Sequence, residues 1–289
     1  MTKILILGGG GMVGQKLANH LLASGLPGHK ALDITLFDMA FPLKQDGRLR
    51  CLTGSLTDAQ TITMLARLRP DIVFHLASIV SGEAESNFDA GWQVNMFTMW
   101  HYLEALKALH IESNRAYVPK IIFTSSIAVF GGPFPEQIDD TFLSAPQTSY
   151  GAQKASCELL LSDFSRKGFV DGISLRLPTI CVRPGKANLA ASSFFSGIIR
   201  EPLNGQKAIL PVDASVRHWH ASPRAAAGFL QHAATLDSGL LENRRALNLP
   251  GVSCTVEEQI EAVRSSAGQS DIKFIGWQPS DRIIKNSSP

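Results

Sequence analysis

The sequence predicts an α/β fold, in which a doubly wound parallel sheet takes up the first two-thirds of the chain and a smaller C-terminal lobe follows. Three observations predict it. Strand-like and helix-like segments alternate up to residue 177, several of the strand-like segments are apolar throughout, and a run of glycines joins the first strand to the first helix. Alternating strands and helices form parallel sheets with helices on both faces, and strands buried on both faces are apolar.

Hydrophobic periodicity assigns the elements in order. The expected strands are residues 3–7, 32–37, 48–52, 71–76, 120–124 and 172–177. The expected helices between them are residues 12–23, 58–68, 88–109 and 147–167, and Asp58 is expected to start the second of these. After Pro178 prolines separate shorter elements, and helical spacing returns near residues 192–199, 223–234 and 256–266. We therefore expect a Rossmann-like domain over residues 1–178 and a smaller substrate-binding lobe over residues 179–289. Whether parts of that lobe pack back on the first domain is left open.

Composition excludes several classes of protein. The 289 residues are 45% hydrophobic, which supplies a sizeable core, and the net charge of +2 comes without a long basic run, so no nucleic-acid partner is expected. The four cysteines, Cys51, Cys157, Cys181 and Cys254, form no close pair, so we expect reduced thiols in place of a zinc site or disulfides. No apolar run resembles a signal peptide or a membrane span, so we expect no membrane contact and a cytoplasmic location.

A glycine-rich turn after the first strand predicts a dinucleotide site. Gly8, Gly11 and Gly14 have the G-x-x-G-x-x-G spacing, which permits a tight turn and lets a pyrophosphate approach the backbone at a helix N-terminus. A glycine run alone also fits a flexible loop or a packing site. The strand before it, the helix after it and Asp38 at the end of the second strand favour the cofactor. The Asp38 carboxylate can bind ribose hydroxyls and would repel a 2′-phosphate, so NAD is expected over NADP.

Tyr150 and Lys154 stand four residues apart in an expected helix, so their side chains share a face. Tyrosine is a poor base at neutral pH unless a nearby cation favours its phenolate, as the Lys154 ammonium would. Ser126 ends the strand before this helix, and ligands bind at the carboxyl ends of parallel strands. An exposed helix pair and a capping serine are the simpler interpretations. Taken together, the residues predict alcohol oxidation, with Tyr150 as base and Ser126 bonded to the reacting oxygen, whereas Ser125 is expected to be structural.

These residues resemble the extended short-chain dehydrogenase/reductase superfamily, which includes the NAD-dependent epimerases and dehydratases. The matching pieces follow in the superfamily's order over the N-terminal two-thirds: the glycine turn, Asp38, residues 75–77, residues 124–131 and Tyr150-x-x-x-Lys154. The resemblance implies Ser126, Tyr150 and Lys154 as the catalytic residues, NAD as the cofactor, and a homodimer. The cofactor contacts expected with it are Gly8, Gly11, Met12, Val13, Gly14, Asp38, Ser55, Leu56, Leu76, Ala77, Asn95, Tyr150, Lys154 and Pro178.

Longer stretches resemble the branch of this superfamily that oxidises D-erythronate, a four-carbon sugar acid, at C2 with NAD, which implies 2-oxo-erythronate as the product. These stretches are residues 75–85, 124–133, 146–151, 176–179, 182–186 and 191–194. The chain departs from the pattern in two places. Gly54-Ser55 replaces a Gly-Asp pair, so the adenine contact is expected to be weaker or absent. Members of the branch continue past the region of Trp277 with a further helical stretch, whereas this sequence ends at Pro289, so a less complete substrate lobe is expected.

A sugar acid needs a cation or several N–H donors for its carboxylate. Arg183 is the first candidate, with Lys186 nearby and Arg217 as the second choice, although each also fits a surface charge or an ion pair. The expected substrate contacts are Ser81, Ser126, Tyr150, Arg183, Ser193 and Arg217. His218 and His220 are expected to point to opposite faces of their strand and not to share a metal ion, so no metal site is expected.

Two other functions fit the same motifs. The first is a nucleotide-sugar epimerase or dehydratase, and the second is a non-catalytic protein that senses NAD. Dehydratases of the superfamily usually carry an acid pair just after the catalytic serine, where this chain has Ile127-Ala128, which disfavours elimination. Epimerases keep the same serine, tyrosine and lysine and are harder to exclude. The intact Tyr150–Lys154 pair disfavours a non-catalytic role.

Overall fold

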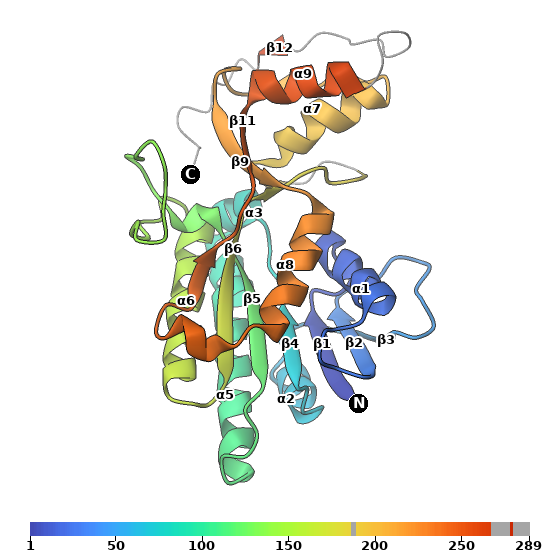
Figure 1. The fold of residues 1–289 in the computed structure, drawn as a ribbon, viewed down its shortest axis with the longest axis vertical. Helices are drawn as coiled ribbons and strands as arrows, with labels where there is room; N and C mark the ends of the chain where they lie inside the picture. Colours follow the sequence, from blue (N-terminus) through green and yellow to red (C-terminus); the bar gives the residue numbers. More distant parts are fainter. Residues whose placement is uncertain (186–188, 267–277, 280–289) are drawn as a thin grey trace.

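The chain is built around one parallel sheet of seven strands (Figure 1). A computed structural model describes residues 1–185, 189–266 and 278–279. The strand order is β3-β2-β1-β4-β5-β6-β10, and all neighbouring pairs are parallel. The strands are β1 (Thr2–Leu7), β2 (Leu32–Asp38), β3 (Arg50–Thr53), β4 (Ile72–His75), β5 (Lys120–Ser126), β6 (Asp171–Leu177) and β10 (Ala246–Asn248). The winding direction reverses between β1 and β4, which confirms the predicted doubly wound, Rossmann-like fold.

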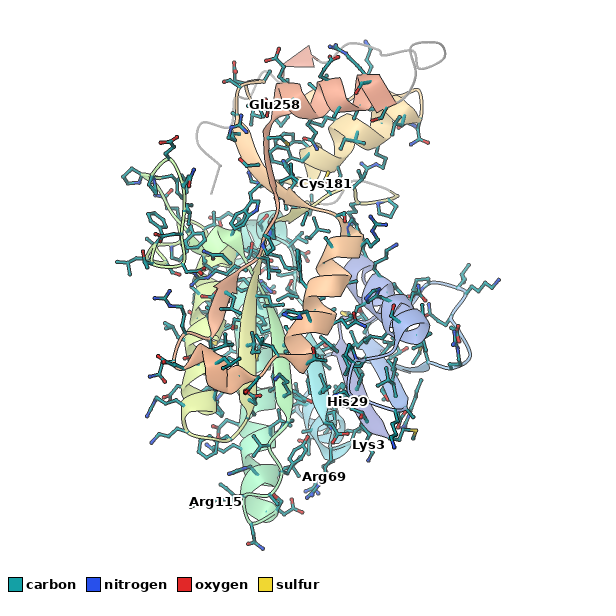
Figure 2. The ribbon with its side chains drawn as sticks, in the orientation of Figure 1. Lys3, His29, Arg69, Arg115, Cys181 and Glu258 are labelled. Carbon is teal, nitrogen blue, oxygen red and sulfur yellow. The ribbon has the colours of Figure 1, made fainter. Side chains whose placement is uncertain are left out.

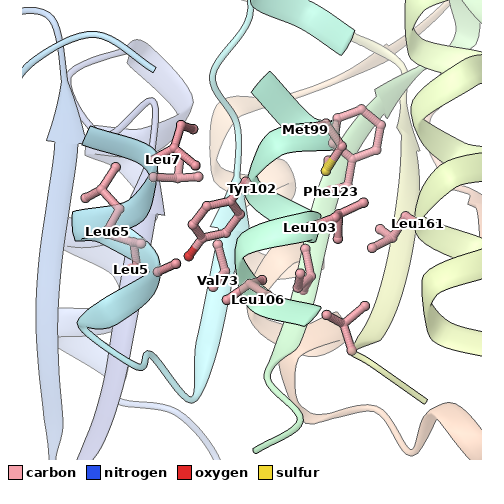
Figure 3. Packing of buried hydrophobic residues seen from close by; sticks show 14 of the residues in the cluster. Leu5, Leu7, Leu65, Val73, Met99, Tyr102, Leu103, Leu106, Phe123 and Leu161 are labelled. Carbon is pink, nitrogen blue, oxygen red and sulfur yellow. The ribbon is translucent and has the colours of Figure 1, made fainter. Parts of the chain in front are cut away.

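Helices cover both faces of this sheet because successive strand residues point to opposite sides. Leu5 and Leu7 of β1 belong to a core shared with α2 (Ala59–Arg67), α5 (Thr98–Glu112) and α6 (Ser149–Arg166). Ile4 and Ile6 belong to a second core with α1 (Met12–Ser24) and α8 (Pro223–Thr235). Figure 3 shows Tyr102 packed among the leucines of the first core. Each large apolar side chain buried in this way contributes about 1.5–3 kcal/mol.

Two polar side chains fix where helices begin. The Asp58 carboxylate accepts hydrogen bonds from the backbone N–H groups of Gln60 and Thr61 at the start of α2, which confirms the predicted start. The Thr148 hydroxyl accepts a hydrogen bond from the Gly151 N–H at the start of α6. Each such cap satisfies backbone donors that the helix itself leaves without partners. The second cap matters for the site, because it sets where Tyr150 and Lys154 enter the helix.

The helical stretch expected over residues 88–109 is confirmed, because the chain is helical from Phe88 to Glu112, but it is not a regular α-helix throughout. It runs through α4 (Phe88–Gly91), the π-helical segment η1 (Trp92–Phe97) and α5, and the short helix α3 (Ser81–Ser86) precedes it. The Asn87 side chain accepts a hydrogen bond from the Ala90 N–H and so caps the start of the stretch. The wider turn of η1 lets Asn95 bind the backbone of the loop after β4, as described below. Apolar spacing alone does not distinguish a π-helical segment from an α-helical one.

The segments after residue 178 contribute to both parts of the molecule. A second sheet has the order β11-β9-β7 and lies with two helices above the main sheet in Figure 1. Its elements are β7 (Thr179–Ile180), β9 (Arg217–Ala221), β11 (Val252–Thr255), α7 (Ser193–Leu203) and α9 (Val256–Ser266). Between them, α8 packs beside α1 and β10 extends the main sheet at β6. The remaining short elements are η2 (Ile127–Val129), η3 (Ser238–Leu241), β8 (Ile209–Leu210) and β12 (Gln278–Pro279).

Candidate active site

A cavity of about 460 Å³ lies at the carboxyl ends of β4, β5 and β6 and reaches into the second lobe. This is the edge of a parallel sheet where ligands bind. It brings together the following predicted site residues: Val13, Leu76, Ser81, Ser126, Tyr150, Lys154 and Pro178. Other residues that line it were not predicted: Ser78, Val80, Gln147, Thr148, Thr179, Ile180, Ala190, Ala191, Ser192, Phe194, Phe195 and His218. Many of these additional lining residues lie after residue 178, in segments whose contacts with the first domain cannot be read from the sequence.

The glycine turn packs too tightly for side chains at most of its positions. Gly8 has a φ of +84°, and a Cβ there would lie 2.7 Å from the backbone nitrogen of Ala77. A Cβ on Gly14 would lie 2.3 Å from the carbonyl oxygen of Gly8, and one on Gly10 would lie 2.0 Å from that of Ala40. Gly11 differs, because its Cβ would meet only the Gly8 carbonyl oxygen, at 3.4 Å. The space in front of Gly11 is therefore open.

These features fit a dinucleotide. Gly11 is the N-cap of α1 and supplies no side-chain cap, so the first-turn N–H groups face the open space without an acceptor of the helix's own. Helix N-termini of this kind attract phosphate groups. Met12 and Val13 begin the helix, and Val13 also lines the cavity. The phosphates and the nicotinamide of one bound molecule would thus have adjoining places.

Asp38 closes the turn from the neighbouring strand. Its carboxylate accepts hydrogen bonds from the Gly10 N–H at 2.9 Å and the Met39 N–H at 2.7 Å. Each carboxylate oxygen keeps a further lone pair, so Asp38 can still accept from ribose hydroxyls. Asp38 therefore holds the turn and still presents a carboxylate beside it.

Tyr150, Lys154 and Ser126 meet in the cavity. Lys154 is 1% exposed, and its Nζ donates to the Thr124 carbonyl oxygen at 2.9 Å. The same Nζ lies 4.7 Å from the ring centroid of Phe123 and 5.5 Å from that of Tyr150. The Ser126 hydroxyl accepts a hydrogen bond from the Ala128 N–H at 3.1 Å. The Lys154 ammonium is thus held beside the Tyr150 ring, between the strand β5 and the helix α6.

A buried ion pair supports this wall from behind. Arg176 donates three hydrogen bonds to the Glu158 carboxylate, from Nε to Oε1 at 3.0 Å and to Oε2 at 3.2 Å, and from Nη2 to Oε2 at 2.8 Å. The Ser125 hydroxyl donates to the same carboxylate, and Asn248 of β10 accepts from the guanidinium. Ser125 thus has a structural contact, as expected, while the ion pair was not predicted. Paired charges of this kind fix strand and helix relative to each other.

His75 lies under the same wall. It is 1% exposed at the end of β4, and neither ring nitrogen has a hydrogen-bond partner among the described residues. Its ring meets that of Phe123 edge-on, with the centroids 5.9 Å apart. Burial, with a smaller contribution from the Lys154 charge, lowers the pKa of His75 to about 3. A neutral ring therefore packs below the one buried ammonium of the described cavity lining.

The other expected cofactor contacts lie around the turn and behind the cavity. Asn95 accepts a hydrogen bond from the Ile79 N–H at 2.8 Å and donates to the Gln153 side chain at 2.7 Å, so it joins the loop after β4 to α6. Ser55 bonds Thr57 within its own loop at 2.8 Å. Leu56 is buried in the core beneath, and Ala77 lies against Gly8. Asn95 has a structural role in these contacts.

The structure places some of the expected substrate residues at the cavity and others away from it. Ser81 lines the cavity and accepts a hydrogen bond from the Ala191 N–H at 3.1 Å. Ser193 begins α7, one residue after the lining residue Ser192. Arg183 is held through its backbone, which donates to the Ser196 hydroxyl at 2.9 Å, and it does not line the cavity. Lys186 falls outside the described residues.

Arg217 points away from this site. Its guanidinium is half-exposed, donates to the Ser253 carbonyl oxygen at 3.1 Å and pairs with Glu258 at 3.3 Å. Figure 2 shows Glu258 at the far end of the second lobe, beyond Cys181. Among the described residues that line the cavity, Lys154 supplies the single cationic side chain and there is no Asp or Glu. A bound carboxylate would accordingly meet mostly hydroxyl, amide and backbone N–H donors there.

The expectation that His218 and His220 point apart is wrong. Residues two apart on a strand share a face, and the two ring centroids lie 5.1 Å from each other. Burial lowers the pKa of His218 to about 3 and that of His220 to about 4, and His220 adds to the effect on its neighbour. In the described residues no three His, Cys, Asp or Glu side chains are arranged to hold a metal ion. No described helix is long and apolar enough to cross a membrane.

Comparison with known sequences places these motifs in context. Residues 4–240 match the model of the NAD-dependent epimerase/dehydratase family. The chain is similar to a D-erythronate dehydrogenase from Cupriavidus necator, with 45% identity over 286 residues that cover 97% of this chain and 86% of the relative. It is also similar to a D-erythronate dehydrogenase from Haemophilus influenzae, with 41% identity over 283 residues that cover 97% and 87%.

Solved structures agree with the fold. A nucleoside-diphosphate-sugar epimerase from Agrobacterium tumefaciens is 49% identical, with a TM-score of 0.90 over 98% of this chain and 83% of that chain. A UDP-glucose 4-epimerase from Thermus thermophilus, solved in complex with NAD, has a TM-score of 0.80 over 99% and 88% at 20% identity. The second likeness bears on the fold alone.

Proposed function

The chain belongs to the NAD-dependent epimerase/dehydratase family, and from that premise we propose that it oxidises D-erythronate, a four-carbon 2-hydroxy acid, to 2-oxo-erythronate. The chain is an NAD-dependent dehydrogenase that acts on an alcohol. The substrate is supported by the two relatives with that name. The observation that carries the mechanism is that Ser126, Tyr150 and Lys154 line one cavity at the end of the sheet that carries the glycine turn.

We assign the proton transfer to Tyr150. Its phenolate would accept the proton of the C2 hydroxyl, while the Ser126 hydroxyl hydrogen-bonds the same oxygen and holds it in place. Lys154 stabilises the phenolate as a fixed positive charge, because the Thr124 carbonyl oxygen anchors its Nζ beside the tyrosine ring. Ser81 is placed to bind another part of the acid, since it lines the same cavity.

NAD is the cofactor, and when bound it supplies the acceptor for the hydride from C2. The open space at Gly11 would admit its pyrophosphate, in a turn that Gly8 and Gly14 allow to pack closely, and Asp38 would bind the adenosine ribose. Leu76 and Pro178, which line the cavity, would shield the reacting carbon from water.

The direct test is the Tyr150→Phe variant. We expect kcat for D-erythronate to fall by about 10²–10⁴-fold because the base is lost, while NADH binding, measured by fluorescence, stays near the wild-type value. Tyr117→Phe is the matched control, because its hydroxyl donates to the Pro70 carbonyl oxygen far from the cavity. Turnover by Tyr150→Phe at the wild-type rate would refute the mechanism.

A second candidate is a nucleotide-sugar epimerase, which the name of the 49% identical structure favours. An epimerase returns the hydride within one turnover, so no NADH accumulates. Incubation with NAD and a panel of four-carbon sugar acids, followed by absorbance, separates the two reactions. The dehydrogenase proposal predicts steady NADH formation. Reaction of a nucleotide sugar alone, without NADH, would favour the epimerase. The lack of Asp and Glu among the described cavity residues argues against a dehydratase.

We further propose a homodimer that meets through α5 and α6. Trp100 on α5 is 38% exposed, Phe97 just before it is 40% exposed, and Leu159 on α6 is 74% exposed. The ring of Trp100 packs edge-on against Phe164 of α6, so the two helices present these groups close together. Exposed apolar patches on a monomer commonly mark interfaces.

We also propose a cytoplasmic location. All four cysteines are free in the structure, and Cys157 is buried. Unpaired thiols are typical of proteins from reducing compartments. Fractionation of the producing cell, with immunodetection of the protein, would test this assignment.

A further inference from the structure

Thr179 and His218 form a hydrogen-bonded pair in the wall that the second lobe contributes to the cavity. Thr179 begins β7 and His218 lies on the adjacent strand β9. The Thr179 Oγ1 and His218 Nε2 atoms lie 2.6 Å apart. Both residues line the cavity that contains Ser126 and Tyr150. The pair therefore belongs to the surroundings of a bound substrate, although neither residue has a role in the proposed proton transfer.

The His218 ring is held in one orientation. Phe195 stacks on it with ring centroids 4.3 Å apart and an interplanar angle of 15°, and His220 meets it edge-on. The residue is only 6% exposed and lines the cavity. The Nδ1 atom of His218 has no hydrogen-bond partner within the described part of the chain, and it is not completely buried. A ligand in the cavity is accordingly its available partner.

The hydrogen count of the pair selects a kind of ligand. Burial keeps the imidazole neutral at pH 7, because the pKa of His218 is lowered to about 3. A neutral imidazole carries one N–H and a threonine one O–H, and one of these two hydrogens is used between them. Whichever tautomer is present, the pair keeps one donor and at least one acceptor for the cavity. A hydroxyl group both donates and accepts and matches this pair, whereas a carboxylate only accepts.

We propose that the Thr179–His218 pair is a specificity element that hydrogen-bonds a chain hydroxyl of the polyhydroxy acid, beyond the carbon that is oxidised. The proposal rests on the proposed function, because it presumes a 2-hydroxy acid substrate. In D-erythronate the hydroxyls on C3 and C4 are the groups in question. The pair would favour hydroxylated acids over their deoxy analogues and would supply no charge to the carboxylate.

The test compares two substrates across matched variants. The substrates are D-erythronate and 2-hydroxybutanoate, which keeps C2 and the carboxylate but lacks the distal hydroxyls. We expect His218→Phe to lower kcat/KM for D-erythronate about 10- to 100-fold and for 2-hydroxybutanoate less than about threefold, because a lost buried hydrogen bond affects only the substrate that makes it. His218→Gln keeps a donor and an acceptor and should retain more discrimination than His218→Phe.

His220→Phe is the packing control, since His220 touches the same Phe195 ring but does not line the cavity. It should change both substrates by the same factor. Thr179→Val removes the other half of the pair with little change of shape and carries the test if His218→Phe does not fold, as judged by thermal melting.

The outcomes are distinct. Equal losses on both substrates in the His218 and Thr179 variants would overturn the specificity element while leaving the proposed function intact. The same selective loss in His220→Phe would also overturn it, because packing would then explain the effect. Failure of the wild-type protein to form NADH from either acid would overturn the proposed function and this inference with it.

Discussion

The glycine turn shows how one position can serve the fold and its neighbour the ligand. Gly10 and Gly11 are adjacent in sequence, but a Cβ on Gly10 would lie 2.0 Å from the Ala40 carbonyl oxygen, whereas one on Gly11 would lie 3.4 Å from its nearest neighbour. The first glycine is needed by the protein itself. The second is needed only if something approaches the backbone from the open side.

This difference predicts opposite results for two small substitutions. Gly10→Ala should lower the free energy of unfolding by about 1–3 kcal/mol, because the backbone must shift to admit the methyl group. Gly11→Ala should leave thermal stability without NAD nearly unchanged but weaken NADH binding at least about tenfold, since its Cβ enters the space for the pyrophosphate. Melting temperature and NADH titration measure the two effects. Wild-type NADH affinity in Gly11→Ala would contradict the assignment of this space to the cofactor.

Residues could be predicted from the sequence where local spacing determines their neighbours. The i, i+4 spacing of Tyr150 and Lys154 places them on one helix face, and the structure brings them to the same cavity as Ser126. His218 and Thr179 stand 39 positions apart and meet only because β7 pairs with β9. Sequence spacing gives no sign of that contact, and the same holds for the Arg176–Glu158 ion pair.

Among the elements, β9 concentrates buried histidines. His218 and His220 lie side by side on it, with their pKa values lowered to about 3 and about 4 by burial. In the unfolded chain a histidine has a pKa near ~6.5, so below that pH the unfolded state binds protons that the folded state refuses. The two histidines therefore cost no stability above about pH 6.5, and the protein loses stability as the pH falls from there toward their pKa values in the folded state.

For each of these histidines, we expect the free energy of unfolding to fall by up to about 1.4 kcal/mol per pH unit between about pH 6.5 and the pKa of that histidine in the folded state. His220→Leu should remove one such contribution and flatten the decline. Urea unfolding at pH 7, 6 and 5, for the wild type and the variant, measures the two slopes. Parallel slopes in the two proteins would contradict a buried, neutral His220.

The π-helical segment η1 shows why element boundaries were only partly predictable. Apolar spacing predicts one helical stretch over residues 88–109, and the chain is helical there, but η1 replaces α-helical turns with π-helical ones where Asn95 turns inward to bind Ile79 and Gln153. The elements with strong periodicity were found within a few residues; the third strand, expected at residues 48–52, runs from Arg50 to Thr53. A local change from α- to π-helical turns leaves the hydrophobic pattern unchanged.

At the scale of the whole molecule, the exposed apolar groups on α5 and α6 predict the assembly state. Sedimentation of the wild type should give a dimer, and Trp100→Glu combined with Leu159→Glu should give a monomer, because charges would be buried without partners. Leu240→Glu is the control, since this side chain is 76% exposed on η3 and not on the proposed interface. A wild-type monomer, or a dimer that survives the double substitution, would contradict the proposed interface.

The alternation of strands and helices predicted the overall architecture. It did not predict which C-terminal segments form the second lobe and which pack on the first domain. Prolines after residue 178 indicated shorter elements, and the structure uses some of them for the second lobe and returns others to the first. The strand β10 is three residues long and pairs with β6. So short a strand carries no periodicity of its own, and only the unpaired edge of β6 creates a place for it.

That short strand has a consequence for how each molecule is made. The other six strands of the main sheet are complete at Leu177, but Ala246–Asn248 leaves the ribosome about 70 residues later. At roughly 5–20 residues per second the interval is roughly 4–14 s. Throughout it the edge of β6 offers unpaired backbone groups to any other nascent chain, and Arg176 lacks its contact with Asn248. Three residues late in the sequence thus set how long this edge of the sheet stays unpaired during synthesis.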